Sequence, residues 1–218
     1  MDWSYALLSA SEQQLFARLS VFVGRWPLAA AEAICSGDGI ARQQILDLVG
    51  ALVDKSLVTV ARGDATRYRL LEPVRQSAAE WLNEAGCTEQ MRDRHRDWYL
   101  ELVELAEPEW WGPTQTDWLE RLEDAHENLR AALTWSLTTP HAERGPELAD
   151  VGLRLVGALA DFWRQHGYAT EGRRWLEQAL ASAEPATPPA VRARALSGAA
   201  LLAWMQQDYP AARPLAAA

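Results

Sequence analysis

Two residue types on which many functional sites depend are scarce in this chain of 218 residues, which has two cysteines and a single lysine, Lys55, against 20 arginines. Two cysteines cannot form a disulfide framework, and this indicates a reducing compartment. No apolar run approaches the roughly 20 residues of a membrane span, and the N-terminus lacks the basic start of a signal peptide. The sequence therefore predicts a soluble cytoplasmic protein with no membrane partner.

The chain also has fewer basic than acidic residues, 21 against 30. The net charge is −9 and the pI is near 5.0. Residues 1–86 hold 8 basic and 10 acidic side chains, and the remaining residues hold 13 and 20. Because phosphate binding needs clustered positive charge, a chain of this composition is a poor general binder of polyanions.

Catalytic motifs are missing from the sequence. A P-loop needs a glycine-rich loop before its Lys-Ser or Lys-Thr pair, and none precedes Lys55 and Ser56 at the right spacing. None of the four histidines stands at the spacing of a metal-ligand pair, and there is no G-x-S-x-G sequence. The sequence predicts no catalytic, metal-binding or cofactor-binding residue, and hence a chain that is not itself an enzyme.

The first 86 residues show the pattern of a winged helix. A capping box of Ser9 and Glu12 opens the first helix. Helical periodicity then gives way to strand-like alternation and returns. The predicted elements are helices from Ser9 to about Phe22, over Leu28–Ile34 and over about Ala41–Asp54, strands over Leu57–Val60 and Tyr68–Leu71 joined by a turn at Arg62–Ala65, and a helix from Pro73 to Leu82.

From Thr88 onward the sequence predicts helices only. They are expected at about Glu89–Ala106, Gln115–Leu137, Glu147–His166, Ala169–Ala183, Ala190–Gln206 and from Pro210 on, with a linker over Thr138–Pro146. The spacing of Trp163, Gly167, Gly172 and Leu176 matches the tetratricopeptide repeat, in which small residues let two antiparallel helices approach. An ordinary antiparallel helix bundle is the alternative. Because repeat arrays need about three units and a polar cap, we expect a fragment of a longer protein.

The expected fold is therefore mainly α, with a winged-helix domain that contains a small β-hairpin, followed by a tetratricopeptide-like helical array. The expected divisions are 1–86 for the winged-helix domain, 87–145 for a helical linker region and 146–218 for the truncated repeats.

Charge argues against DNA binding by this winged helix. Its predicted recognition helix carries Arg42 against Asp47 and Asp54. The wing is more basic, with Arg62, Arg67 and Arg69 against Asp64. A protein that reads duplex DNA usually has a basic stripe, and none is evident along the sequence.

Three stretches resemble the region that follows the nucleotide-binding domain in bacterial STAND ATPases, large regulators that are also described as LuxR- or SARP-type transcriptional regulators. The stretches lie within residues 3–22, within 52–75 (LVDKSLV and YRLLEPVR) and within 112–177 (HENLRAAL and GRRWLE). The resemblance implies a winged helix packed against an ATPase module N-terminal to Met1, with ATP or ADP bound only there. It also implies a repeat array that binds a protein or a small-molecule effector.

One position departs from that family. Related proteins often carry Met-His-Asp at the end of the wing, with a histidine that contacts the nucleotide, whereas Leu70, Leu71 and Glu72 stand at the matching positions here. Our hypothesis is that Glu72 and Arg75 make polar contacts to the ATPase module. The alternative is that Glu72 merely begins the following helix and complements its dipole.

Trp110 and Trp111 form an aromatic pair before a helix break at Gly112 and Pro113. They are candidates for partner binding or for stapling two helices together. Taken together, the sequence predicts a non-catalytic, signal-sensing fragment of a STAND-type regulator that exerts intramolecular control. The alternative is a DNA-binding winged-helix regulator with a helical effector domain.

Overall fold

The computed structural model describes residues 5, 7–61, 65–138 and 147–217, with no side-chain detail for 147–149. The expectations for the turn arginine Arg62, for Asp64 and for the linker over 139–146 therefore lie outside the described residues. The chain forms two compact units. Unit 1 comprises Met1–Trp98 with Asp124–Leu129, and unit 2 comprises Tyr99–Glu123 with Arg130–Ala218.

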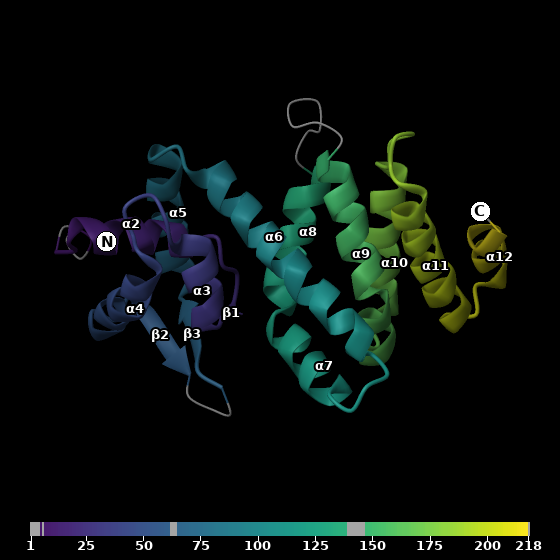
Figure 1. Ribbon diagram of the computed structural model, residues 1–218, viewed down its shortest axis with the longest axis horizontal. Coiled ribbons are helices and arrows are strands. Elements are labelled where there is room, and N and C mark those ends of the chain that lie inside the picture. The colour runs from purple at the N-terminus through teal and green to yellow at the C-terminus, as the bar shows by residue number, and fades with distance from the viewer. Residues whose placement is uncertain (1–4, 6, 62–64, 139–146, 218) are drawn as a thin grey trace. The chain divides into compact units, whose positions relative to one another are not determined.

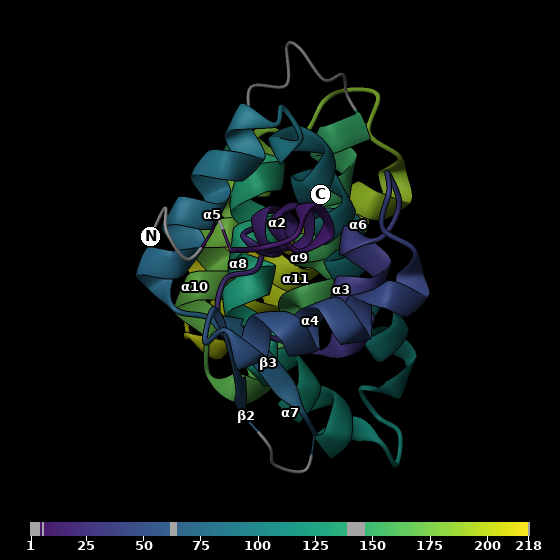
Figure 2. The ribbon, with the colours of Figure 1, turned by 90° about the vertical axis from the view of Figure 1, so that its left-hand side faces the viewer.

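Unit 1 combines a group of helices with a three-stranded antiparallel sheet that lies at one edge of them (Figures 1 and 2). Its elements are α2 (Ala10–Leu19), β1 (Arg25–Trp26), α3 (Leu28–Cys35), the 3₁₀ turn η1 (Arg42–Gln44), α4 (Ile45–Asp54), β2 (Val58–Ala61), β3 (Arg67–Leu70), α5 (Glu72–Glu84) and the first half of α6 (Thr88–Ala106). The predicted capping box is confirmed, since the Ser9 amide donates to Glu12 Oε2 at 2.7 Å and the Glu12 amide donates to Ser9 Oγ at 3.3 Å.

The sheet has one more strand than the hairpin that the sequence predicts. Its order is β1-β3-β2, with Arg25 opposite Arg69 and Trp26 opposite Tyr68. A strand of two residues is too short to show alternation, so no local pattern reveals it. Its inward residue, Trp26, is fully buried and stacks on Tyr68 with ring centroids 5.0 Å apart. Burial of this large ring therefore holds β1 in the sheet.

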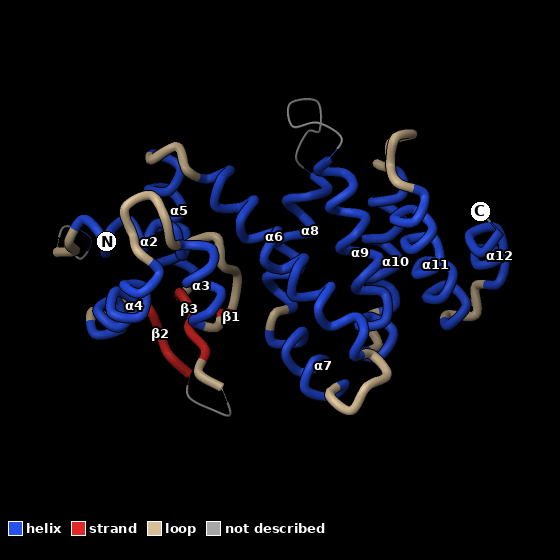
Figure 3. The backbone as a smooth tube through the Cα atoms, in the orientation of Figure 1, coloured by secondary structure: helices blue, strands red, loops and turns tan. Residues whose placement is uncertain are grey.

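Unit 2 is helical throughout its described residues, and the strands lie in the N-terminal part of the chain (Figure 3). Beyond α6 the elements are η2 (Glu107–Glu109), α7 (Gln115–Asp124), α8 (His126–Thr138), α9 (Glu147–His166), α10 (Ala169–Ala181), α11 (Pro189–Met205) and α12 (Tyr209–Ala217). The predicted fold class, mainly helical with a small sheet and a winged helix, is confirmed. In unit 2, α9, α10 and α11 pack side by side (Figure 1).

The single helix expected over Gln115–Leu137 is wrong. The chain forms two helices, and α7 ends at Asp124 while α8 begins at His126. The residues at this junction, Asp124–Leu129, pack with unit 1, whereas the remainder of both helices belongs to unit 2. The helical periodicity of the sequence continues through the junction, but the packing of the junction residues in unit 1 divides the segment into two helices.

Candidate functional site

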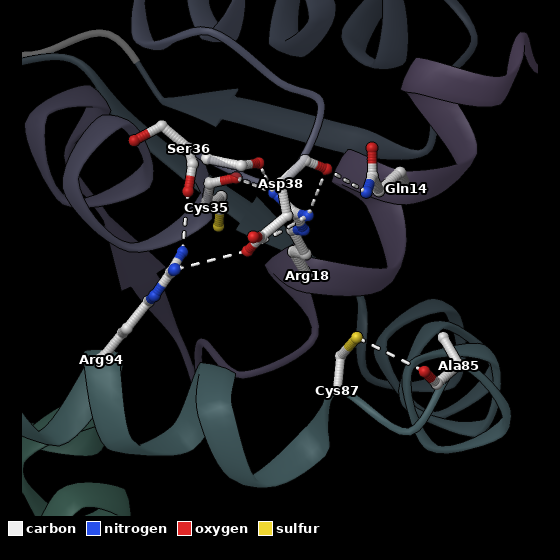
Figure 4. Close-up of polar contacts among 9 residues, drawn as sticks. Gln14, Arg18, Cys35, Ser36, Asp38, Ala85, Cys87 and Arg94 are labelled. Carbon is white, nitrogen blue, oxygen red and sulfur yellow. Dashed lines mark hydrogen bonds and ion pairs between the residues drawn. The ribbon is translucent and has the colours of Figure 1, made fainter.

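The turn between α3 and α4 is fixed by a buried arginine of α2. The Arg18 guanidinium donates to the carbonyl oxygens of Cys35, Gly37 and Asp38 at 2.7, 2.6 and 3.1 Å (Figure 4). Gly37 and Asp38 have φ values of +90° and +48°, so the backbone reverses sharply here. Carbonyl groups at a helix end and in a turn need donors from outside the regular ladders. The arginine supplies them for three carbonyls, of which that of Gly37 also accepts from the Ile40 amide at 3.2 Å. Arg18 thereby holds the turn that leads from α3 towards η1 and α4.

A second arginine reaches the same turn from α6. Arg94 donates to the Ser36 carbonyl at 2.7 Å and lies 3.4 Å from Asp38 Oδ2, while Gln14 of α2 donates to the Asp38 carbonyl at 2.8 Å (Figure 4). Sequence reasoning missed Arg18 and Arg94. The only signal for Arg18 is a charged residue inside the apolar stripe of its helix.

The exposed surface of η1 and α4, the predicted recognition helix, carries little positive charge. Its exposed side chains in η1 and α4 include Arg42, Gln43, Leu46, Asp47 and Asp54. Arg42 lies 3.3 Å from Glu32, which partly neutralises it. The slightly negative charge that the sequence predicts for this helix is therefore also the charge of its exposed surface.

The solvent face of the sheet is different, because β1 brings a third arginine to it. Arg25 on β1 is the direct neighbour of Arg69 on β3, and Arg67 lies two residues from Arg69 on the same strand. Side chains alternate across a sheet, so Arg25, Arg67 and Arg69 share one face. Arg25 and Arg69 are exposed and Arg67 is half-buried. We call these three residues the arginine face.

The arginine face brings like charges close together. Like charges directly opposite each other on neighbouring strands are destabilising, and Arg25 opposes Arg69. Among the described residues, Arg67 Nε lies 3.2 Å from Asp124 Oδ2, and the charge of Arg69 is one of the causes that lower the pKa of Glu72. Guanidinium groups bind phosphate and carboxylate oxygens through paired N–H donors, so this surface favours an anionic partner.

A buried asparagine joins the α7–α8 junction to the loop before β1. Asn128 is fully buried, accepts from the Val23 amide at 2.8 Å and donates to the Arg25 carbonyl at 2.8 Å. Its Oδ1 also lies 3.2 Å from His95 Nε2. Since Asn128 offers an acceptor at that atom, the network assigns the His95 proton to Nε2. Asn128 follows a histidine and a glutamate in the sequence, so no local pattern marks it as a buried residue.

His95 is held neutral by its surroundings. Burial lowers the pKa of His95 to about 4, against the opposing effect of the Asn128 hydrogen bond and with a small further lowering by Arg92. His95 also packs edge-on against Phe22, with ring centroids 5.6 Å apart. A charged imidazole here would be costly.

His95 should make folding stability depend on pH in an unusual range. An unfolded histidine takes up a proton near pH 6.5, whereas folded His95 does so near pH 4, so stability falls as the pH drops between these values. We expect a loss of roughly 2 kcal/mol between pH 7 and pH 5, measured by urea unfolding. In the His95→Gln variant this loss of stability between pH 7 and pH 5 should disappear. An equally steep loss in that variant would contradict the assignment.

The two predicted contact residues of α5 bind each other. Arg75 donates to Glu72 Oε2 at 2.9 Å and to Oε1 at 2.7 Å, and its third donor lies 3.3 Å from the Ser20 carbonyl. The Arg75 guanidinium lowers the pKa of Glu72 to about 2. The pair is accessible on the Glu72 side, and its role towards a further module stays a prediction.

The two adjacent tryptophans lie in different environments. Trp110 is 2% exposed, whereas Trp111 is 78% exposed and stacks beneath the Arg164 guanidinium at 4.9 Å. Only Trp111 is therefore open to a partner as it stands, while Trp110 packs inside unit 2. Partner binding by this pair stays a prediction.

The described residues offer few features for small-molecule chemistry. An open cavity of about 430 Å³ in unit 1 is lined by Tyr5, Trp81 and Cys87 among others, and Tyr5 stacks on Trp81. The Cys87 thiol lies 3.4 Å from the Ala85 carbonyl (Figure 4), and burial raises the pKa of the Cys35 thiol to about 12. In the described part of the chain, no three His, Cys, Asp or Glu side chains gather as metal ligands. None of the helices described there is long and apolar enough to cross a membrane.

The sequence of unit 1 is similar to a known domain. Residues 8–83 match the model of the winged helix-turn-helix domain. Proteins of Mycobacterium tuberculosis and Mycobacterium bovis that are provisionally named HTH-type transcriptional regulators are 37% identical over 213 residues, which is 94% of this chain and 23% of each relative. An uncharacterized protein of Mycobacterium tuberculosis is 42% identical over 99 residues, covering 44% of this chain and 25% of that protein. The chain thus spans about a quarter of the length of these relatives. No solved structure matches it.

Proposed function

We propose that this chain is part of a transcriptional regulator, in which the winged helix-turn-helix domain contacts DNA and the helical unit binds an effector. The names of the relatives favour this alternative over the STAND fragment that the sequence predicts first. The observation that carries the proposal is the arginine face. Counting charges along the chain underestimates the wing, because β1 places Arg25 beside Arg69 from a distant part of the sequence.

The arginine face suits phosphate binding and not base reading. Guanidinium contacts to DNA phosphates supply affinity and orientation but carry no sequence information. Base reading would belong to the N-terminal end of the recognition helix, where Arg42 and Gln43 are exposed. Such residue types pair with guanine and adenine edges. We therefore expect weak, salt-dependent binding with little sequence preference from the wing.

A duplex-binding titration with matched charge variants tests the proposal. The probe is a short random-sequence DNA duplex, and the readout is fluorescence anisotropy at several salt concentrations. Arg25→Gln with Arg69→Gln is expected to weaken binding about tenfold at low salt, and to make the salt slope shallower by about 1.8 through loss of two phosphate contacts. Arg192→Gln with Arg213→Gln removes equal charge from exposed positions of α11 and α12. It should leave affinity within about twofold.

Equal losses in the two double variants would mean that net charge and not the arginine face drives binding. Absence of binding by the wild-type chain at low salt would remove the proposal. It would favour the second candidate, a non-catalytic regulatory segment of a STAND-type ATPase. The exposed surface of α4 supports that candidate, because Leu46 is 52% exposed beside Asp47 and is better suited to a protein than to phosphates.

The second candidate has its own test. The chain has no P-loop sequence, so ATP or ADP would bind only to a module outside it. In the full-length protein, Glu72→Ala should then weaken ADP retention by breaking the polar contacts that Glu72 and Arg75 make to that module. Unchanged retention would remove this role for the pair.

The helical unit is proposed to be tetratricopeptide-like and to bind a protein or small-molecule effector in the cytoplasm. Support comes from the close approach of its helices at Gly172, where Trp163 of α9 and Leu202 of α11 lie against the glycine. Exposed Trp111 gives it one aromatic anchor of the type found in binding surfaces.

A further inference from the structure

We infer that the α7–α8 junction, residues Asp124–Leu129, is an autoinhibitory clamp on the arginine face, an inference that rests on the proposed DNA contact. Asp124 gives Arg67 of the face a counter-charge, with its Oδ2 atom 3.2 Å from Arg67 Nε. The pair is partly shielded, since the Arg67 side chain is 18% exposed and that of Asp124 is 43% exposed. A DNA phosphate would have to displace this carboxylate to use Arg67.

The clamp is anchored independently at the edge strand of the same sheet. Asn128 binds the Val23 amide and the Arg25 carbonyl, so it fixes the backbone from which the Arg25 side chain extends. Gly24, between them, has a φ of +79°, and a Cβ atom there would collide with the Glu127 carboxylate. The absence of a side chain at Gly24 thus lets the junction lie directly on the loop.

These contacts set apart one short segment of two longer helices. Residues Asp124–Leu129 cluster with unit 1, while the rest of α7 and α8 belongs to unit 2. An effector that reshapes the helices of unit 2 would therefore pull on the clamp through the chain itself. Withdrawal of the clamp would free Arg67, so that it joins the exposed Arg25 and Arg69 in binding phosphate.

The first test removes the counter-charge alone. Asp124→Asn keeps the shape of the side chain and should bind the random-sequence duplex about fivefold more tightly than wild type, with a salt slope steeper by about 0.9 from one added phosphate contact. Asp117→Asn, an exposed position on the same helix, removes equal charge and should change affinity less than twofold. In an Arg67→Gln background, the effect of Asp124→Asn should vanish.

The second test does not need DNA. Phenylglyoxal modifies accessible arginines, and mass spectrometry of the digested protein reports the extent at each site. We expect Arg67 to react slowly in wild type and in Asp117→Asn, and several-fold faster in Asp124→Asn, with Arg25 and Arg69 as exposed references. Unchanged reactivity of Arg67 in Asp124→Asn would overturn the clamp whatever the DNA result.

The two tests separate this inference from the proposed function. If the wild-type chain binds duplex and Asp124→Asn binds no more tightly, the clamp is overturned while DNA contact stands. If no variant binds duplex but Arg67 reactivity rises selectively, DNA contact fails and the restraint of the wing by Asp124 stands without a regulatory role in DNA binding. Tighter binding and faster modification together support the clamp.

Discussion

Replacing Asn128 with leucine is expected to lower the free energy of unfolding by about 4 kcal/mol. Leucine has the same branched arrangement of side-chain heavy atoms but neither accepts nor donates a hydrogen bond. The Val23 amide, the Arg25 carbonyl and His95 Nε2 would each lose the partner that Asn128 now provides. Every buried polar group left unsatisfied costs roughly 1–3 kcal/mol, and water reaches this site poorly because Asn128 is fully buried.

A matched control separates this network from general effects of adding a hydrophobic residue. Asn83→Leu changes an exposed asparagine of α5 and should alter stability by no more than about 0.5 kcal/mol. Urea unfolding followed by tryptophan fluorescence compares the two variants. A loss below about 1 kcal/mol for Asn128→Leu would mean that the three partners find other hydrogen bonds.

The winged-helix elements were predictable because each has a strong local signal. The capping box of Ser9 and Glu12 marks the first helix, and the change from helical to alternating periodicity marks the wing. The exception is β1, whose position depends on the burial of Trp26 against Tyr68. A pairing between distant segments leaves no periodic trace when the strand has only two residues.

The candidate site was predictable only in part, because it too depends on contacts between segments that are distant in the sequence. Arg67 and Arg69 were visible as a basic wing, but Arg25 joins them only through the register of β1 with β3. Asp124 and Asn128 lie in a segment whose periodicity predicts one continuous helix, and tertiary hydrogen bonds divide that helix. Charge along the sequence therefore describes the recognition helix well and the sheet poorly, since a sheet face is assembled from separate segments.

In unit 2, Gly172→Val is expected to cost about 3 kcal/mol through overpacking. A Cβ atom at Gly172 of α10 would lie 2.6 Å from Leu202 Cδ1 and 2.6 Å from Trp163 Cε3. Both neighbours are buried, so neither can move aside without opening contacts elsewhere in a close-packed interior. The helix propensity of valine exceeds that of glycine by a few tenths of a kcal/mol, which offsets little of this loss.

Gly50→Val is the control for that substitution, because Gly50 also lies within a helix, α4, yet a Cβ atom there meets nothing within 4 Å. It should leave the free energy of unfolding unchanged or raise it slightly, since only helix propensity changes. Urea unfolding of both variants measures the difference. If Gly172→Val proved as mild as Gly50→Val, α9 and α11 would have room to separate around α10. The small residue that the tetratricopeptide spacing requires at this position would then not be needed for packing, and an ordinary helix bundle would be the better description of unit 2.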